Sequence, residues 1–579
     1  MGCSVTLALM SRGPTRARWH APVQACLMVT ILLAGCSTPA PDAPAQTAEP
    51  PRSPGAGPGP VEPPFDMLPA EPFTFTASDG ITLSGYLWRP KVSDGVRVPV
   101  LLEVTQYPLR RSGDGDTPAK EIVPRGFALA KVNARGMSAS GGCFNDSGLR
   151  EQEDVLGIID HLSKQPWSNG RVGMIGVSSS APAVMAAAIH APPALKAVVV
   201  SGMVASSYTF SHTPQGAASS IAPDFAKMAM ERYGNQQPCP FEESETIREG
   251  IAHDNRDWLY WEERNFLARM PQVRAAVLVA QGFQDTLRSG HSFEEDVVFQ
   301  ALSNAPVFQL IPQATHGWPS DSGARPEWNM PEWWNITGQW FSYWLADAGP
   351  LPDGLGTVRY QDSAGQWRNS TMWPPREAQE EALYLANKKL RPAPADASAT
   401  FHLRAPEEGW LDTACGPTPR SLLYESPPMA RDAVIAGNPY AVLQITSSAP
   451  GGIVSVDVFD VPASGACDSA TFSSGAIHLT RGAADLRFLT DPYNGTDFPT
   501  GIPVSVRVDL MNIAHVLSEG RALAVVVGRG GPERTGQPFE ATIDISGGSW
   551  ITLPFVEGSF GGSLPPAAPP RPLLPAPAA

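Results

Sequence analysis

The sequence lacks the features by which several classes of protein are recognised. It has no His-Glu-x-x-His motif and no zinc-type spacing of cysteine and histidine, so neither a metal nor another cofactor is expected. It also lacks an excess of basic residues, since 57 Asp and Glu outnumber 42 Lys and Arg. The net charge of −15 argues against nucleic acid as a partner and is ordinary for an exported enzyme.

The apolar run near the N-terminus, residues 25–33, is too short for a permanent membrane-spanning helix. Arginines precede it and Leu33-Ala34-Gly35-Cys36 follows, which predicts a signal peptide over residues 1–36. These four residues resemble the lipobox of bacterial lipoproteins, so Cys36 is the expected lipidation site. We expect an exported protein, held by its lipid to a bacterial membrane in the periplasm or at the cell surface. A plain signal peptide with a chance cysteine is the alternative.

Two segments are poor in large apolar side chains. Residues 37–65 are rich in proline and alanine and predict an extended tether between an anchor and a globular body. Residues 561–579 have a similar composition and are expected to be disordered.

Four cysteines follow the signal region, and in an exported protein they allow three disulfide pairings. Their distribution, two in each expected domain, favours pairing within each domain over pairing between them. Free buried thiols are the alternative. The favoured pairs are Cys143 with Cys239 and Cys415 with Cys467.

At 579 residues the chain needs at least two domains. Residues 66–350 alternate buried strands with a helical pattern, which predicts an α/β fold with a doubly wound sheet. The strand rhythm lapses at about 203–270, and we expect a helical cap over the carboxyl ends of the strands, with a peripheral helical excursion as the alternative. Residues 351–560 consist of many short strands separated by turns, which predicts a β-sandwich.

The most informative segment is Gly176-Val177-Ser178-Ser179-Ser180, between an apolar strand and an alanine-rich helix. This is the layout of a nucleophile elbow, in which a strained turn raises one serine above the sheet. Ser178 occupies the apex and is the expected nucleophile. Ser179 is then expected to offer its backbone N–H to an oxyanion.

A serine nucleophile needs a base and a carboxylate, in the chain order Ser, Asp, His for this fold class. Asp285 and His316 each follow a predicted strand, so their side chains are expected to converge on Ser178. Tyr107 follows an earlier strand, and its hydroxyl is the expected second oxyanion donor. A tyrosine before a proline is otherwise more often a packing residue.

Together these segments resemble a known family. The resemblance extends over about residues 70–555 and rests on the elbow and on residues 78–83, 106–108, 134–142, 165–173 and 282–285. It is to the X-Pro dipeptidyl-peptidase (peptidase S15) and cocaine esterase group of α/β-hydrolase serine hydrolases. It implies a Ser178, Asp285 and His316 triad, a Tyr107 oxyanion donor, a helical cap and a C-terminal jelly-roll.

The elbow departs from that family, which usually has Ser-Tyr-x-Gly where this chain has Ser178-Ser179-Ser180-Ala181. The missing tyrosine changes the wall of the site. A second departure is Asn133, where an aspartate is usual.

We expect a serine hydrolase that cleaves small ester or amide substrates through an acyl-enzyme. A true dipeptidyl-peptidase is an alternative, and it would need a carboxylate for the substrate ammonium; Glu242, Glu243, Glu262 and Glu263 lie in the cap region. A surface-binding lipoprotein with a degenerate hydrolase body is a further alternative.

Overall fold

The computed structural model describes residues 64–109, 117–203, 205–219, 230–235, 258–285, 295–321, 328–351, 353–403, 421–462, 475–491, 493–529, 534–535 and 539–571. The expected signal peptide with Cys36, most of the tether, and Cys239, Glu242, Glu243, Cys415 and Cys467 lie outside these residues. Their predicted roles therefore stay predictions.

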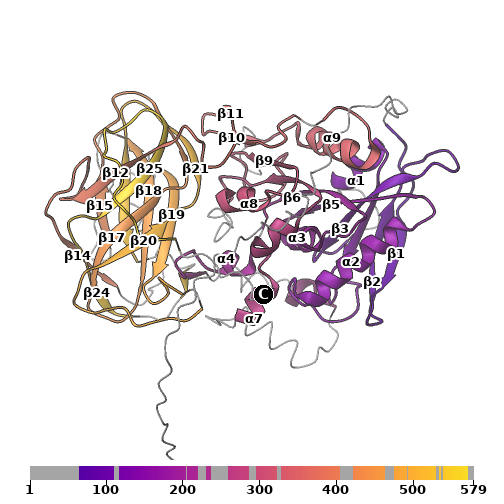
Figure 1. The fold of residues 1–579 in the computed structure, drawn as a ribbon, viewed down its shortest axis with the longest axis horizontal. Coiled ribbons are helices and arrows are strands. Elements are labelled where there is room, and N and C mark those ends of the chain that lie inside the picture. The colour runs from indigo at the N-terminus through magenta and orange to yellow at the C-terminus, as the bar shows by residue number, and fades with distance from the viewer. Residues whose placement is uncertain are drawn as a thin grey trace, which may run out of the picture. The chain divides into compact units, whose positions relative to one another are not determined.

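Within the described residues, ten strands form the first sheet, in the order β1-β2-β4-β3-β5-β6-β8-β9-β10-β11 (Figure 1). The strands from β4 to β10 in this order are parallel, and β1, β2 and β11 are antiparallel to their neighbours. The bounds are β1 Glu71–Thr76, β2 Thr82–Trp88, β3 Val98–Thr105, β4 Ala128–Asn133, β5 Ser168–Val177, β6 Leu195–Ser201, β8 Ala276–Ala280, β9 Val307–Ile311, β10 Val358–Gln361 and β11 Trp367–Ser370.

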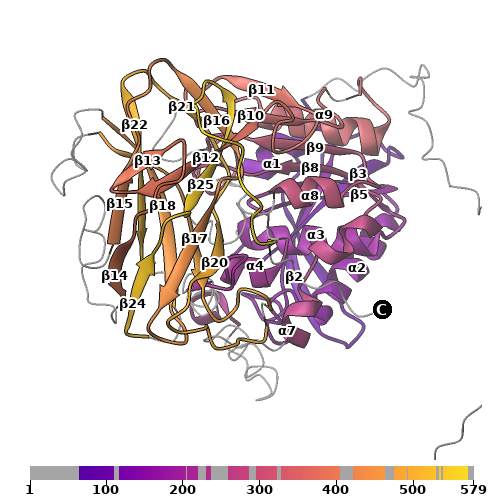
Figure 2. The same cartoon turned by 60° about the vertical axis from the view of Figure 1, so that its left-hand side comes forward.

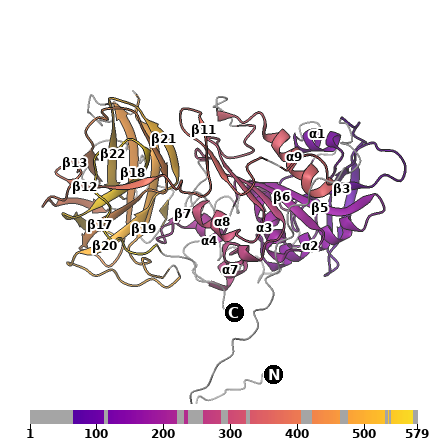
Figure 3. The same cartoon turned by 45° about the horizontal axis from the view of Figure 1, so that its top comes forward.

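Helices cover both faces of this sheet, as the buried apolar strands require. Figure 3 shows α2 (Leu149–Ser163) and α3 (Ala181–His190) on one side of β3, β5 and β6, and α1 (Thr117–Ile122) and α9 (Trp333–Ala346) on the other. The two apolar cores follow this division, since alternate residues of β3 enter the α2/α3 core and the α1/α9 core. No helix in the described ranges is long and apolar enough to cross a membrane.

Strands β10 and β11 belong to the first sheet. The sequence pattern assigned residues 358–370 to the C-terminal sandwich. In the structure β10 pairs in parallel with β9, and β11 pairs antiparallel with β10. The first sheet therefore extends past residue 350, because the unpaired edge of β9 takes up the next available strand.

The segment between β6 and β8 contains short elements: α4 (Ser207–Ser211), β7 (Ala218–Ser219), α7 (Trp258–Glu263) and the 3₁₀ helix η3 (Leu267–Gln272). Strand β7 pairs with β23 (Arg534–Thr535) of the C-terminal part. The Thr213 hydroxyl donates to the carbonyl of Ala483, 2.7 Å away, and the Gln215 amide donates to Asp509. This segment, called the insertion below, is therefore fixed to the C-terminal part by buried polar contacts.

The C-terminal part is all-β within the described residues, and Figure 2 shows its strands. Its core is formed by aliphatic and aromatic side chains that alternate along the strands. The bounds are β12 Gln379–Ala386, β13 Lys389–Arg391, β14 Ala399–Leu403, β15 Ser421–Glu425, β16 Ala433–Gly437, β17 Tyr440–Ser447, β18 Ile453–Pro462, β19 Ile477–Asp485, β20 Val504–Asp509, β21 Ile513–Leu517, β22 Arg521–Gly528, β24 Ala541–Ile545 and β25 Trp550–Glu557.

The start of the proline-rich tail differs from the expected disorder. The Ala382 N–H of β12 donates to the carbonyl of Ser563, and the Gly562 N–H donates to Glu381. Ala568 packs against an aromatic cluster of the same domain. Backbone pairing with β12 thus holds residues that composition alone assigned to a disordered tail.

Candidate active site

Ser178 lies at the end of β5, in the turn that leads into α3. The 3₁₀ turn η2 (Ser178–Ser180) joins the strand to the helix, and Ser178 has the left-handed φ of 56°. A side chain at Gly176 would place its Cβ 2.7 Å from the carbonyl oxygen of Ser180, so only glycine fits there. Strain of this kind at a single serine is the geometry of a nucleophile elbow.

The structure brings Ser178, His316 and Asp285 together. His316 Nε2 lies 2.6 Å from Ser178 Oγ, and His316 Nδ1 lies 2.8 Å from Asp285 Oδ2. The three residues follow β5, β9 and β8, so the parallel strands deliver them to one edge of the sheet. A carboxylate only accepts hydrogen bonds, so the Nδ1 proton faces Asp285 and Nε2 is free to accept the serine proton.

His316 is held in position by several residues that the sequence did not single out. Gly202 has a φ of 58°, and a Cβ there would lie 3.2 Å from His316 Cε1, closer than an ordinary van der Waals contact. The Ser201 hydroxyl donates to the carbonyl of Gly317, 2.7 Å away. The buried Gln313 amide donates to the carbonyl of Ala514 in the C-terminal part. The histidine loop is therefore held from both domains.

Tyr107 and Ser179 lie on the same sheet edge as Ser178. Tyr107 follows β3, the parallel neighbour of β5, and its ring meets Tyr233 edge to face at 5.8 Å. The Asn133 amide donates to the Tyr107 carbonyl at 2.7 Å, which an ionised aspartate could not do. The unusual asparagine therefore fixes the backbone of the Tyr107 loop.

A buried ion pair lies beneath the elbow. Lys131 Nζ is 3.0 Å from Glu103 Oε2, and the two residues face each other across β3 and β4. The Ser180 hydroxyl donates to Glu103 Oε1 at 3.1 Å. The Glu103 carboxylate, which is paired with Lys131, therefore fixes the hydroxyl of the third serine of the elbow. The charges within otherwise apolar strands were the sequence signal for this ion pair.

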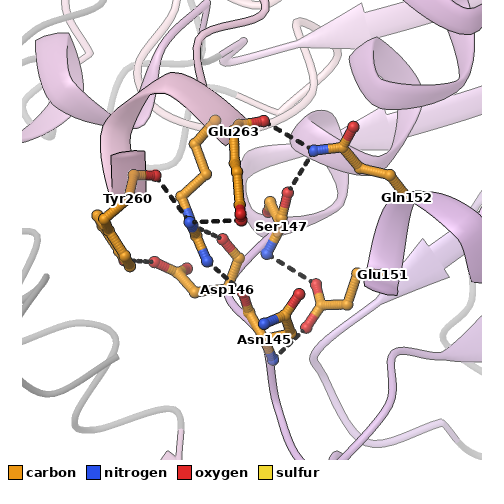
Figure 4. Close-up of polar contacts among 8 residues, drawn as sticks. Asn145, Asp146, Ser147, Glu151, Gln152, Tyr260 and Glu263 are labelled. Atoms are coloured by element: carbon orange, nitrogen blue, oxygen red, sulfur yellow. Dashed lines mark hydrogen bonds and ion pairs between the residues drawn. The ribbon is translucent and has the colours of Figure 1, made fainter. Parts of the chain in front are cut away.

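The loop that precedes α2, residues 143–148, is hydrogen-bonded both to α2 and to the insertion (Figure 4). Asp146 and Ser147 both have left-handed φ, which is costly for residues other than glycine. The Glu151 carboxylate accepts the N–H groups of Asn145 and Ser147, at 2.6 and 2.9 Å. Burial raises the pKa of Glu151 to about 7.

Residues of the insertion hold the other side of this loop. The buried Arg264 donates to the carbonyls of Asn145 and Asp146, both at 2.8 Å, and lies over the Tyr260 ring. The Tyr260 hydroxyl donates to Asp146 at 2.6 Å, and burial together with that carboxylate raises the tyrosine's pKa. Cys143 is disulfide-bonded, while its expected partner lies outside the described residues.

Two of the family-like motifs are joined by Arg135. Its guanidinium donates to both oxygens of Asp154, at 2.7 and 2.8 Å, and to Asp79 at 2.8 Å. The side chains of Arg135 and Asp154 are almost fully buried. This pair connects the hairpin, the loop after β4 and α2, so these motif residues are structural. No three His, Cys, Asp or Glu side chains among the described residues are grouped to hold a metal ion.

The parallel sheet, the elbow and the histidine at the sheet edge define a hydrolase of the α/β-hydrolase class. A family model described as X-Pro dipeptidyl-peptidase (S15 family) matches residues 79–318. A second model, the X-Pro dipeptidyl-peptidase C-terminal non-catalytic domain, matches residues 353–535. The chain therefore contains an S15-family domain followed by the C-terminal domain of the X-Pro dipeptidyl-peptidases, which confirms the resemblance stated from its motifs.

Known relatives are distant in sequence. The Xaa-Pro dipeptidyl-peptidase of Lacticaseibacillus casei is 24% identical over 514 residues, which span 75% of this chain and 62% of that protein. The structure of an α-amino acid ester hydrolase has a TM-score of 0.68 at 17% identity and covers 85% of this chain and 97% of its own. An aminopeptidase from a Thaumarchaeota archaeon has a TM-score of 0.65 at 17% identity and covers 84% and 97%. Both structures show the same fold.

Proposed function

We propose that this protein is a serine hydrolase that cleaves esters or amides of small acyl groups through an acyl-enzyme. The chain of hydrogen bonds from Asp285 through His316 to Ser178, with Ser178 in a left-handed turn, is the observation that supports this most directly. His316 accepts the Ser178 proton as the serine oxygen attacks the substrate carbonyl. It then donates that proton to the leaving alcohol or amine, and water releases the acid by the same route. Asp285 keeps the Nδ1 proton in place.

The tetrahedral intermediate needs donors for its oxyanion. We assign this role to the Ser179 N–H, which follows the nucleophile at the start of a helical turn, and to the Tyr107 hydroxyl. The positions of both residues at the Ser178 edge of the sheet support this assignment.

An active-site probe tests the nucleophile. A fluorophosphonate should label the wild type and should not label Ser178→Ala, with equal melting temperatures as the check on folding. Labelling that survives this substitution would contradict the assignment, and an unlabelled wild type would favour a surface-binding lipoprotein.

Dipeptidyl-peptidase activity is the second candidate, because the curated relatives of this chain carry that name. Such an enzyme must bind the substrate ammonium. Of the cap acids considered, Glu263 lies 3.4 Å from Arg264 and is partly neutralised by it. Purified protein should be assayed on X-Pro-anilides and on short-chain esters. Ester turnover without dipeptide release would exclude the peptidase, whereas efficient dipeptide release would replace our proposal.

We also propose that Cys36 is lipidated and anchors the protein to a bacterial membrane. The support is the lipobox-like sequence and the proline-rich tether after it. A radiolabelled fatty acid should be incorporated into the wild type and not into Cys36→Ala. Equal incorporation into both proteins would contradict this localisation.

A further inference from the structure

A pocket lies beside the elbow, between the first turns of α2 and α3. It is small and partly open to solvent. Ser179, whose N–H is a proposed oxyanion donor, lines it, and so does Gln106, the residue before Tyr107. We call it the Ser179 pocket. Its lining residues are Val104, Thr105, Gln106, Ala134, Ser147, Glu151, Gln152, Val155, Ser179, Pro182, Ala183 and Ala186.

Small side chains create this space. Ser179, Ala183 and Ala186 present short side chains to it from the elbow and from the first turns of α3. The expected tyrosine after the nucleophile would project from position 179, where the sequence has serine. The serine that replaces the family's usual tyrosine at position 179 therefore lines an open space beside the nucleophile.

The polar side chains at the far end of the pocket are already engaged. Both oxygens of Glu151 accept backbone N–H groups. The Gln152 amide donates to the carbonyls of Ser147 and Glu263, and its oxygen lies 3.1 Å from His190 Nε2. Within the described part of the chain, the buried Ser179 Oγ has no hydrogen-bond partner. Of the remaining lining residues, Thr105 and Gln106 are polar and the other six are aliphatic.

We propose that the Ser179 pocket receives the acyl group of the substrate and limits it to a short, uncharged aliphatic chain. This inference rests on the proposed function. An acyl chain follows directly from the carbonyl carbon that Ser178 attacks, and the pocket begins at the residues that flank the oxyanion donors. Aliphatic walls and one unpartnered hydroxyl suit a chain of a few carbons.

Charged acyl groups fit this pocket poorly. An anionic group would face the Glu151 carboxylate. A cationic group would face the N-terminal ends of α2 and α3, which carry partial positive charge. The two Glu151 oxygens that could offset this are already shared with backbone N–H groups.

The test varies the acyl chain at constant leaving group. The p-nitrophenyl esters of acetate, propionate, butyrate, octanoate and alanine are compared for kcat/KM. Ser179→Leu and Ala183→Leu fill the pocket from different positions, and Ala183→Val is a milder second version. Ser180→Ala is the matched control, because Ser180 belongs to the same elbow but does not line the pocket.

The wild type should prefer butyrate to octanoate and propionyl to alanyl ester. Both filling variants should lower the butyrate-to-acetate ratio about ten-fold, since one methylene in an apolar pocket is worth at least that factor. Ser180→Ala should leave the ratio unchanged, whatever its total rate.

Three results would overturn the inference: a ratio that is unchanged in the Ala183 variants, a ratio that falls only in the Ser179 variant, or a wild type that prefers the alanyl ester. Fluorophosphonate labelling of each variant separates the two proposals. An unlabelled wild type means that the proposed function has failed. If the protein is labelled but its butyrate-to-acetate ratio is the same in the Ala183 variants as in the wild type, only the pocket assignment is wrong.

Discussion

Replacing Glu151 with glutamine should make the stability of the catalytic domain less sensitive to pH. Burial raises the pKa of this carboxyl from 4.5 to about 7, even though it accepts two backbone hydrogen bonds. Between these two values the folded protein retains a proton that the unfolded chain has lost. The contribution of Glu151 to stability is therefore fully present below pH 4.5 and is lost as the pH rises through 7.

The size of the effect follows from the shift. At about 1.36 kcal/mol per pKa unit, a fully buried carboxyl with this shift would change the free energy of unfolding by about 3 kcal/mol. Glu151 is half-buried and faces the Ser179 pocket, so solvent reduces the effect, to about 2 kcal/mol. For a domain of this size that corresponds to about 4–8 °C in melting temperature.

The assay compares melting temperatures of wild type and Glu151→Gln at pH 5 and pH 8. At pH 5 both side chains are neutral, and the variant should be less stable only by the one backbone hydrogen bond that its NH₂ group cannot accept. At pH 8 only the glutamate is charged. The melting temperature of the variant should therefore rise relative to that of the wild type by about 4–8 °C between these pH values.

Glu153→Gln is the control, because Glu153 is exposed on the same helix. Its melting curve should follow the wild type at both pH values. If Glu151→Gln also kept a constant difference from the wild type, the carboxyl would titrate normally and the argument from burial would be wrong.

Three further substitutions test the proposed chemistry. Asp285→Asn should lower kcat by about 10³–10⁴-fold with little change in melting temperature, because the histidine loses its proper tautomer; a normal kcat would contradict the proposed role. Tyr107→Phe should lower kcat by about 10²–10³-fold with KM nearly unchanged, and an equal rise in KM would instead indicate ground-state binding. Gly202→Ala should lower kcat/KM by displacing His316, since the new Cβ would lie 3.2 Å from its ring; unchanged pH–rate and kinetic parameters would show that the loop adapts.

The sequence was most informative where the local structure is decided by neighbouring residues. An apolar strand that ends in Gly176-Val177-Ser178 predicts a strained turn, because only glycine leaves room for the Ser180 carbonyl. The strands that precede Asp285 and His316 are short apolar runs between turns, and both were expected from periodicity. Sheet topology then places their carboxyl ends together.

What the sequence could not predict depends on contacts between distant segments. Ser201 and Gly202 look like ordinary turn residues until the histidine loop lies against them. Strand β10 has the short, alternating pattern of a sandwich strand, and its membership of the first sheet follows only from its pairing with β9. The ordered start of the tail likewise depends on the part of β12 that β13 leaves unpaired. In each case the deciding partner is remote in sequence.

Residue 179 has two proposed roles, one for its backbone in catalysis and one for its side chain in specificity. Its backbone N–H is assigned to the oxyanion, and that donor exists whatever side chain the residue carries. Its side chain is assigned to the acyl pocket, whose opposite wall is the Glu151 end of α2 and the loop held by Arg264. These assignments predict that a serine in place of the tyrosine usual in the family alters which acyl groups fit, while the donor, Ser178 and His316 keep their places. The departure at the elbow is thus an argument for altered specificity and carries no argument against catalysis.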